Sequence, residues 1–242
     1  MNRKLMIGVI MSGIVLVSCN DPVGPTTQTD PQDDLPPGTV ILSEKFEGDA
    51  LEYLVDGETT AYRQVVYTEG QTLMSLSSQH AHGGAGSLTS ESNNTSIKRT
   101  IEPYIEDSVA GLQFYLMATK ASQTNFFAAI CKPGSAKDGL VTKFGMGIDA
   151  SDSLKWVYQD DLNGAADVHA KFAPLTFNRW YKCAVEYDFS AATLTYFLDD
   201  EIVHTQSVPS LSSLQTFIVI RDGLGAQGSS GYYLDDVAVY KK

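Results

Sequence analysis

The chain has few cysteines and few cations. Three cysteines among 242 residues are too few for a small scaffold held together by several disulfides. Lysine and arginine number 17 against 29 aspartates and glutamates, which gives a formal net charge of −12. Such an acidic chain is not expected to bind nucleic acid or other polyanions by charge, whereas neutral glycans and divalent cations remain compatible. The acidity also fits the simpler interpretation that it keeps an exported protein soluble.

Several other features are missing. No stretch of the folded part shows the apolar period of a helix, and no long hydrophobic run follows residue 17. The G-x-S-x-G elbow, the phosphate-binding loop and the dinucleotide fingerprint are absent as well. The sequence therefore gives no support to the enzyme classes that these motifs mark.

Residues 1–18 have the order of a secretory signal peptide. Arg3 and Lys4 precede an apolar run over 5–17, which is too short to span a bilayer comfortably, and a small residue follows at Ser18. We therefore expect residues 1–18 to be removed. Without Arg3 and Lys4 the cations fall from 17 to 15 against 29 acids, a formal net charge of −14.

The segment Leu16-Val17-Ser18-Cys19 resembles the lipobox of bacterial lipoproteins. The resemblance implies cleavage before Cys19, diacylglycerol on its thiol and a further acyl chain such as palmitate on its new amine. Several acyl chains anchor a protein to a membrane far more firmly than one. Asn20 stands where an inner-membrane retention signal would have Asp, so we expect a lipoprotein of the outer membrane. The alternative is an ordinary signal peptide followed by a chance cysteine.

Two further regions follow the signal peptide. Residues 19–38 are rich in proline and polar side chains and cannot bury apolar surface, which predicts an extended, disordered tether. Residues 39–242 have the size of one large all-β domain, and no repeat or shift in composition divides them.

The period of the apolar residues predicts strands throughout this domain. From Trp180 to Asp188 the chain alternates, with Tyr181, Cys183 and Val185 on one face and Lys182 on the other. Turns separate about a dozen strand-like runs, and the pattern predicts an antiparallel β-sandwich or jelly roll. The runs are Val40–Glu47, Tyr62–Tyr67, Thr72–Ser78, Ser96–Ile101, Gly111–Met117, Asn125–Cys131, Val141–Ile148, Leu154–Tyr158, Arg179–Asp188, Leu194–Leu198, Glu201–Val203, Gln215–Ile220 and Tyr232–Tyr240.

Four segments resemble laminin-G-like, or concanavalin A-like, jelly rolls. They are Phe46-Glu47, His82-Gly83-Gly84-Ala85-Gly86-Ser87-Leu88, the pair Trp180–Asp188 and Phe197–Val203 with Asp-Glu replacing the usual Asp-Gly, and Tyr232–Val239. Their order along the chain matches the family. The resemblance implies a concanavalin A-like jelly roll, in which Trp180 and Tyr187 are expected to be core and sheet-packing residues. It does not imply one function, because the family includes glycan-binding modules, adhesion domains, glycosidases and lyases.

Two candidate sites follow from the residues and the resemblance. Trp156 and Tyr158 alternate onto one face of a strand, where aromatic rings of a lectin-type jelly roll stack on sugars; the alternative is that both rings pack in the core. In related sugar-binding jelly rolls a structural calcium is held where three of the segments converge. Here the resemblance implies Glu47, Asp235 and carbonyls near Gly84-Ala85 as ligands, and oxygen ligands suit a hard cation. The alternative is that Asp235 only bonds a neighbouring strand.

Two other pairs of side chains could form a bond or a metal site. Cys131 and Cys183 lie in apolar strand-like runs and either form a disulfide or remain buried thiols. His80 and His82 stand two residues apart, but no further ligand completes a zinc site, so we expect none.

Catalytic side chains are not expected. The E-x-D-x-x-E strand of jelly-roll glycosidases and the Arg, Gln, His and Tyr cluster of lyases on this fold are not reproduced. The sequence therefore favours a surface lipoprotein that binds a neutral glycan without catalysis. A diverged glycoside hydrolase or polysaccharide lyase and a protein-adhesion domain are the alternatives.

Overall fold

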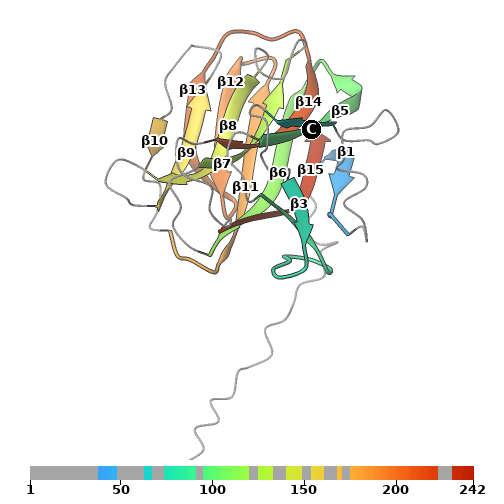
Figure 1. Cartoon of the computed structure of the whole chain (residues 1–242). Coiled ribbons are helices and arrows are strands. Elements are labelled where there is room, and N and C mark those ends of the chain that lie inside the picture. Colours follow the sequence, from blue (N-terminus) through green and yellow to red (C-terminus); the bar gives the residue numbers. More distant parts are fainter. Residues whose placement is uncertain are drawn as a thin grey trace, which may run out of the picture.

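The computed structural model describes residues 38–47, 63–66, 74–90, 95–119, 125–132, 140–148, 154–160, 168–170, 175–222 and 231–242. All regular structure in these ranges is β-strand, and all the strand pairings in them are antiparallel. The strands form two sheets that face each other (Figure 1). Among these residues no helix is long and apolar enough to cross a membrane. The predicted all-β sandwich is confirmed.

The first sheet, sheet A, has eight strands, and β15 lies near its middle. Its order is β13 (Glu201–Ser207), β12 (Thr193–Leu198), β11 (Trp180–Asp188), β6 (Val109–Ala118), β15 (Tyr232–Lys241), β4 (Ser87–Ser90) and β3 (Met74–Ser77), and β1 (Thr39–Glu44) pairs with β15 as well. Strands β4 and β1 therefore pair with different parts of β15.

The second sheet, sheet B, has seven strands. Its order is β10 (Val168–Ala170), β9 (Leu154–Asp160), β8 (Leu140–Ile148), β7 (Asn125–Cys131), β14 (Leu214–Asp222), β5 (Thr95–Ile105) and β2 (Arg63–Val66). At the left end in Figure 1, β10 and β9 lie close to β13 and β12, so this end of the sandwich is built from the terminal strands of both sheets.

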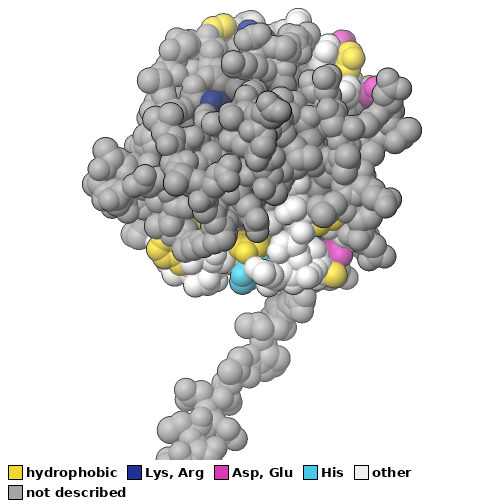
Figure 2. Space-filling view, in the orientation of Figure 1, with side chains coloured by type: hydrophobic (Ala, Val, Ile, Leu, Met, Phe, Trp, Pro, Cys, Tyr) yellow, Lys and Arg dark blue, Asp and Glu magenta, His cyan; other side chains and the backbone are white. Residues whose placement is uncertain are grey.

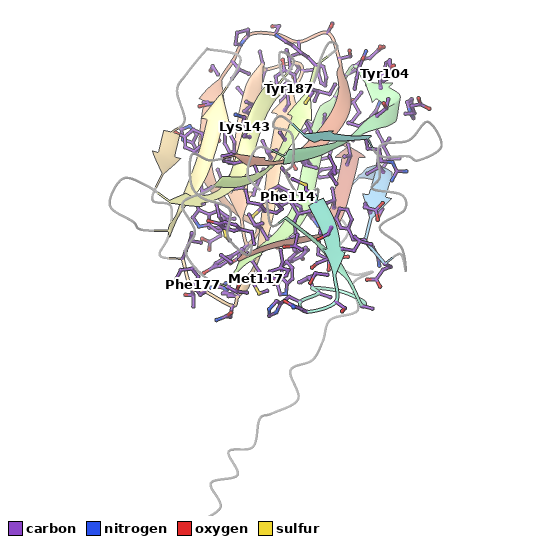
Figure 3. All side chains as sticks on the ribbon, in the orientation of Figure 1. Tyr104, Phe114, Met117, Lys143, Phe177 and Tyr187 are labelled. Carbon is purple, nitrogen blue, oxygen red and sulfur yellow. The ribbon has the colours of Figure 1, made fainter. Side chains whose placement is uncertain are left out.

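The core lies between the sheets and follows the predicted alternation. On β11, the side chains of Tyr181, Cys183, Val185 and Tyr187 are buried in the core, and Figure 3 shows Phe114 of β6 at the centre of the sandwich. Burial of each large apolar side chain contributes about 2 kcal/mol to folding, so this face decides the register of β11.

A tight turn joins β12 to β13. Its two loop residues, Asp199 and Asp200, have φ of 50° and 67°, which is the left-handed pair that a two-residue type I′ hairpin requires. The two turn residues are therefore Asp-Asp, and not the Asp-Glu that the sequence resemblance placed there. Arg179 pairs with Asp199 at 2.7 Å and Lys182 pairs with Asp200 at 2.9 Å, so each carboxylate has its own cation.

Three features differ from the sequence interpretation. Strand β10 was not predicted, because three residues are too few to show a period. Strand β4 occupies the end of the family-like His82–Leu88 segment, which was not counted as a strand. Pro103, a residue type that is typical of turns, lies within β5 at the point where the pairing with β14 is irregular, so its missing N–H costs no regular ladder bond.

The two cysteines of the domain are free thiols. Cys183 lies in β11 of sheet A and Cys131 in β7 of sheet B, and both are buried. Burial, together with the negative charge of Asp199, raises the pKa of the Cys183 thiol. The structure thus favours the buried-thiol alternative over the disulfide.

Candidate functional site

The candidate site begins at a break in the pairing of β15. On one side of this strand, Leu234 pairs with β4, whereas Val237 pairs with β1. Between them, Asp235 and Asp236 have no strand partner on that side, and the register with β6 also shifts before Ala238. Asp236 has a φ of 46°, as expected for a bulged residue that re-aims a side chain.

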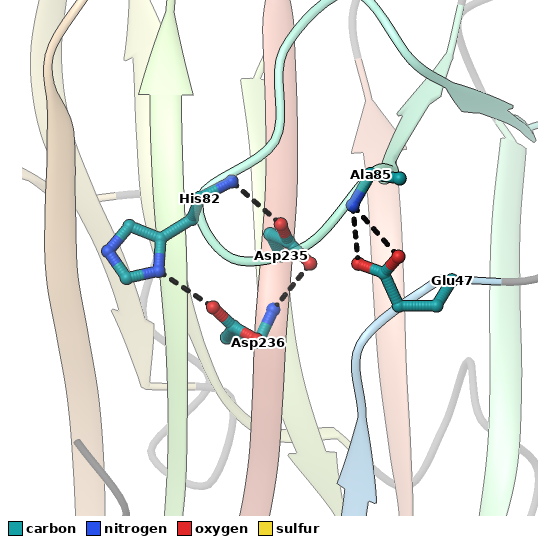
Figure 4. Close-up of polar contacts among 5 residues, drawn as sticks. All are labelled: Glu47, His82, Ala85, Asp235 and Asp236. Atoms are coloured by element: carbon teal, nitrogen blue, oxygen red, sulfur yellow. Dashed lines mark hydrogen bonds and ion pairs between the residues drawn. The ribbon is translucent and has the colours of Figure 1, made fainter. Parts of the chain in front are cut away.

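Backbone amides of the turn before β4 fill this break. The His82 N–H donates to Asp235 Oδ2 at 2.8 Å, the Gly83 N–H also bonds this carboxylate, and the Asp236 N–H donates to Asp235 Oδ1 at 2.8 Å (Figure 4). The Asp235 side chain is completely buried. Hydrogen bonds to a carboxylate are stronger than neutral ones, so Asp235 fixes the turn on the sheet.

Glu47, just after β1, holds the same turn from the other side. Both of its carboxylate oxygens accept from the Ala85 N–H, at 3.0 and 2.8 Å. Gly84 has a φ of +75°, and a Cβ there would lie 1.9 Å from Glu47 Oε1, so this close approach requires glycine. We call Glu47, His82, Ala85, Asp235 and Asp236, the residues drawn in Figure 4, the acidic joint.

The His82 side chain connects the acidic joint to a group of aromatic rings. Its Nδ1 lies 2.7 Å from Asp236 Oδ2, and its ring stacks on Tyr115 with a centroid distance of 3.5 Å. The Trp180 ring stands at 74° to the His82 ring, 5.8 Å away. We call Tyr115, Trp180 and His82 the aromatic corner.

The aromatic corner lies on the outer face of sheet A. Tyr115 pairs with Lys182 on one side and with Asp235 on the other. All three residues alternate with core residues along their strands, so they are on the outer face of the sheet. Tyr115 is buried beneath His82, whereas Trp180 and His82 are partly exposed. Figure 2 shows histidine and hydrophobic side chains together along the lower edge of the view, where Figure 3 places Met117 and Phe177.

The acidic joint has an excess of negative charge. Burial, and after it the charge of Asp236, raises the pKa of Asp235 to about 8, although the amide hydrogen bonds oppose this. Asp236 Oδ1 is buried and has no hydrogen-bond partner, and among the described residues no lysine or arginine bonds Glu47, Asp235 or Asp236. A perturbed carboxyl of this kind is typical of functional sites.

The predicted calcium ligands Glu47 and Asp235 meet here, on either side of the turn that carries Gly84-Ala85. The three family-like segments converge as the resemblance implies, yet amides rather than carbonyls face Glu47 and Asp235. In the described ranges, no three His, Cys, Asp or Glu side chains are arranged to hold a metal ion. Asp236 Oδ1, which is buried without a hydrogen-bond partner, is a further oxygen at this place, and the calcium site stays a prediction.

The predicted aromatic pair is divided between the core and an edge. Trp156 is completely buried, with Tyr181 at 5.2 Å, so a sugar cannot reach its ring and the structure favours the core alternative. Tyr158 is half-buried between the sheets, with Tyr196 at 5.0 Å and His204 at 4.7 Å. The Tyr158 edge is defined here as Tyr158, Tyr196, His204 and Gln206, which bonds His204 at 3.2 Å.

The remaining predicted residues are placed as follows. Cys19, the signal peptide and the tether lie outside the described residues, apart from Gly38. His80 packs against Tyr233 at 4.5 Å and His82 against Tyr115, so the two histidines serve different contacts.

The sequence did not predict that side chains on the outer face of sheet A form the candidate site. Trp180 was expected in the core, but it lies on the outer face because its parity is opposite to that of Tyr181. That signal was present in the alternation. Tyr115 and Asp236 carried no such signal, since their roles depend on the turn folding over the sheet.

Known proteins resemble this chain in fold. No family model and no curated protein matches the sequence. Among solved structures, the carbohydrate recognition domain of Emp47p has a TM-score of 0.53 at 7% identity, over 82% of this chain and 94% of that one. Domain 4 of AbnA, an arabinanase from Geobacillus stearothermophilus in complex with arabinotriose, has 0.51 at 10% identity, over 84% and 93%.

A sialidase has a TM-score of 0.56 at 10% identity, over 85% of this chain. This chain spans 18% of the sialidase, so that similarity concerns one part of a longer protein. Identities this low establish a shared β-sandwich fold of the kind found in carbohydrate-binding domains, and the function must be argued from the site.

Proposed function

We propose that the protein is a surface-anchored lipoprotein that binds a carbohydrate without catalysis. The observation that carries the proposal is the aromatic corner, where the partly exposed rings of Trp180 and His82 stand at 74° to each other. An aromatic ring offers an apolar face to the C–H groups of a sugar, and a few fixed polar groups beside it bond the hydroxyls. His82, held by Asp236, is such a polar group.

The structural neighbours support this proposal without deciding it. By their titles, one is a carbohydrate recognition domain and another holds arabinotriose. Both have the sandwich architecture of this chain, so the fold is compatible with sugar binding.

The membrane anchor is the second part of the proposal. Its support is the lipobox-like Leu16–Cys19 and the proline-rich residues 19–38, which would hold the domain away from the outer membrane. Globomycin, which blocks the signal peptidase of lipoproteins, is expected to cause accumulation of the precursor. Unchanged processing would contradict lipidation of Cys19.

The Tyr158 edge is a second surface that a sugar could contact. Tyr158 and His204 lie half-buried at the end of the sandwich, and burial raises the pKa of the Tyr158 hydroxyl, which stays a neutral hydrogen-bonding group. Tyr158→Ala is expected to weaken glycan binding only if the ligand extends to this edge.

A glycoside hydrolase or polysaccharide lyase is the second candidate. The observation in its favour is the His82–Asp236 contact, since a carboxylate that orients an imidazole is one half of many acid–base pairs. Release of reducing ends or of unsaturated products from a polysaccharide panel would establish this activity and overturn the non-catalytic proposal.

The deciding experiment is retention of the purified protein on a panel of polysaccharides. Trp180→Ala is expected to weaken binding to the retained glycan by at least tenfold, because it removes a partly exposed ring on the outer face of sheet A and no residue of the core. Ile202→Ala is the matched control, since Ile202 is exposed on β13 at the end of sheet A. Unchanged affinity in Trp180→Ala, with an unchanged melting temperature, would contradict the proposed site.

A further inference from the structure

A second exposed aromatic ring lies close to the aromatic corner. Phe177 is 39% exposed and precedes Trp180 by three residues, on the turn that leads into β11. Three residues of extended chain span at most about 11 Å, which limits the distance between the Cα atoms of Phe177 and Trp180. Figure 3 shows Phe177 at the same end of the sandwich as Met117, and Met117 pairs with Trp180 across β6 and β11. One end of the domain therefore carries both rings.

The backbone on both sides of Phe177 is fixed. The Thr176 N–H donates to the Tyr181 hydroxyl at 2.7 Å, and the Asn178 N–H donates to the Ala118 carbonyl at 2.8 Å. Asn178 has a φ of 61°, a left-handed conformation that asparagine adopts more readily than most residues. The Phe177 ring is thus exposed on a turn that is tied to β6 and β11. A ligand that covers this ring costs little backbone entropy, because the turn is already ordered.

The position of Phe177 distinguishes it from other exposed apolar side chains. In the described ranges three large hydrophobic side chains are exposed, namely Tyr104, Phe177 and Ile202. Tyr104 lies far from Phe177 in Figure 3, and Ile202 lies on β13 at the edge of sheet A. Single exposed apolar residues are common on soluble proteins, so exposure alone indicates no site. Phe177 is informative because it shares its end of the domain with Trp180.

The two rings offer two separate surfaces. Trp180 contacts the His82 ring, whereas no ring of the described residues contacts Phe177. A sugar ring is similar in size to a phenyl ring, so one sugar covers one of these side chains. Asn178, exposed between them along the chain, has a side-chain amide with two donors and an acceptor for hydroxyl groups.

We infer that Phe177 and the aromatic corner bind different sugar rings of one carbohydrate chain. The ligand is then an oligosaccharide or an internal segment of a polysaccharide, and not a single sugar. The inference rests on the proposed function and adds the length of its ligand. Its supports are the exposed ring of Phe177, the fixed turn that holds it, and its position three residues before Trp180.

The test measures affinity against chain length. The polysaccharide that the full-length protein retains is cut by partial hydrolysis into fragments, from the monosaccharide to long oligosaccharides, and calorimetry gives the affinity for each. For the wild type, affinity is expected to rise about tenfold once the fragment reaches both rings, because a second stacking contact is gained.

Three variants assign this gain to a residue. Phe177→Ala is expected to lose about tenfold in affinity for the long oligosaccharide and to keep its affinity for the monosaccharide. Trp180→Ala is expected to weaken the binding of both. Tyr104→Ala is the matched control, because Tyr104 is 46% exposed and far from Phe177, and it should bind every fragment as the wild type does. Melting temperatures equal to that of the wild type show that the variants are folded.

Three outcomes would overturn the inference and leave the proposed function intact. They are a wild-type affinity that does not change with chain length, an unaltered length dependence in Phe177→Ala, and an equal loss for all lengths in that variant. The last would place Phe177 and Trp180 at the same sugar. Failure of the wild type to retain any glycan would overturn the proposed function, and the inference with it.

Discussion

Two aspartate pairs show how differently one residue type can be used in this sandwich. Asp199-Asp200 and Asp235-Asp236 both include aspartates at positive φ, and both are on strands or turns of sheet A. The first pair is exposed, and each carboxylate has a cation from Arg179 or Lys182. In the second pair Asp235 is buried and Asp236 is partly exposed; the described structure bonds them to amides and a histidine and leaves one Asp236 oxygen without a partner.

The comparison distinguishes a structural turn, Asp199-Asp200, from the region of the candidate site, Asp235-Asp236. Exposed carboxylates of a turn cost little, because water and neighbouring cations stabilise them. A buried carboxyl group beside another acid and without a cation costs stability, and burial together with the charge of Asp236 raises the pKa of Asp235 to about 8. This difference supports the proposal that the ligand-binding surface is the aromatic corner beside Asp235-Asp236 and not the Asp199-Asp200 turn.

The largest expected difference is in pH dependence. The unfolded chain releases the Asp235 proton near the ordinary pKa of 3.8, whereas the folded protein keeps it until about pH 8. Between these values the folded state binds more protons, so the free energy of unfolding should fall as pH rises, by roughly 1 kcal/mol per pH unit, and level off above pH 8. Denaturant titrations from pH 4 to pH 9 measure this slope.

Asp235→Asn is the control for that slope. The variant loses one amide hydrogen bond and some stability, but its unfolding free energy should vary less with pH, whereas Asp200→Asn should leave the slope unchanged. An unaltered slope in Asp235→Asn would contradict the assignment. Millimolar calcium that removes the slope in the wild type would show that a cation replaces the proton, in favour of the calcium prediction.

A smaller effect is expected for Gly84→Ala in the acidic joint. The new Cβ would displace Glu47 from the Ala85 amide and would place alanine at φ +75°, which together cost about 2 kcal/mol of stability. Chemical denaturation measures the loss. Gly84→Asn tolerates the positive φ but keeps the clash, so a full recovery of stability in this variant would show that Glu47 is not involved.

The turn of the first pair should respond in the opposite direction. Asp200→Gly removes the steric cost of a side chain at φ 67° and is expected to stabilise the protein by up to about 1 kcal/mol. The exposed ion pair with Lys182 that it removes contributes little. A lower melting temperature in Asp200→Gly would mean that this turn depends on its charges.

The smallest effect is expected for Arg179→Ala. The Arg179 and Asp199 side chains are 56% and 39% exposed, so their ion pair should contribute less than about 1 kcal/mol. The loss should shrink further in high salt. A loss of several kcal/mol in the free energy of unfolding would show that this exposed ion pair is important for the stability of the domain.

Most of the fold could be predicted from the alternation of apolar and polar residues along the strands. Tyr181, Cys183 and Val185 face the core as their alternation indicates, because one buried face fixes the register of a strand. The resemblance, and not the alternation, assigned Trp180 to the core, and Trp180 is partly exposed on the outer face, as its parity indicates. For Trp156 the sequence left both faces open, and its ring is buried.

The candidate site could be predicted only in outline. The resemblance brought Glu47, the Gly84 turn and Asp235 together, and the structure agrees. Whether amides or carbonyls of the turn face the carboxylates depends on local backbone angles, such as the φ of +75° at Gly84. Those angles are set by the shared pairing of β1 and β4 with β15, which no local pattern reveals.

The most direct test of the account compares glycan binding by one variant from each region at pH 7. His82→Ala removes the polar group of the aromatic corner, and Asp200→Gly alters the β12–β13 turn. With both variants folded, the account predicts at least tenfold weaker binding of a neutral polysaccharide for His82→Ala and less than a twofold change for Asp200→Gly. Wild-type affinity in His82→Ala, or a loss confined to Asp200→Gly, would contradict it.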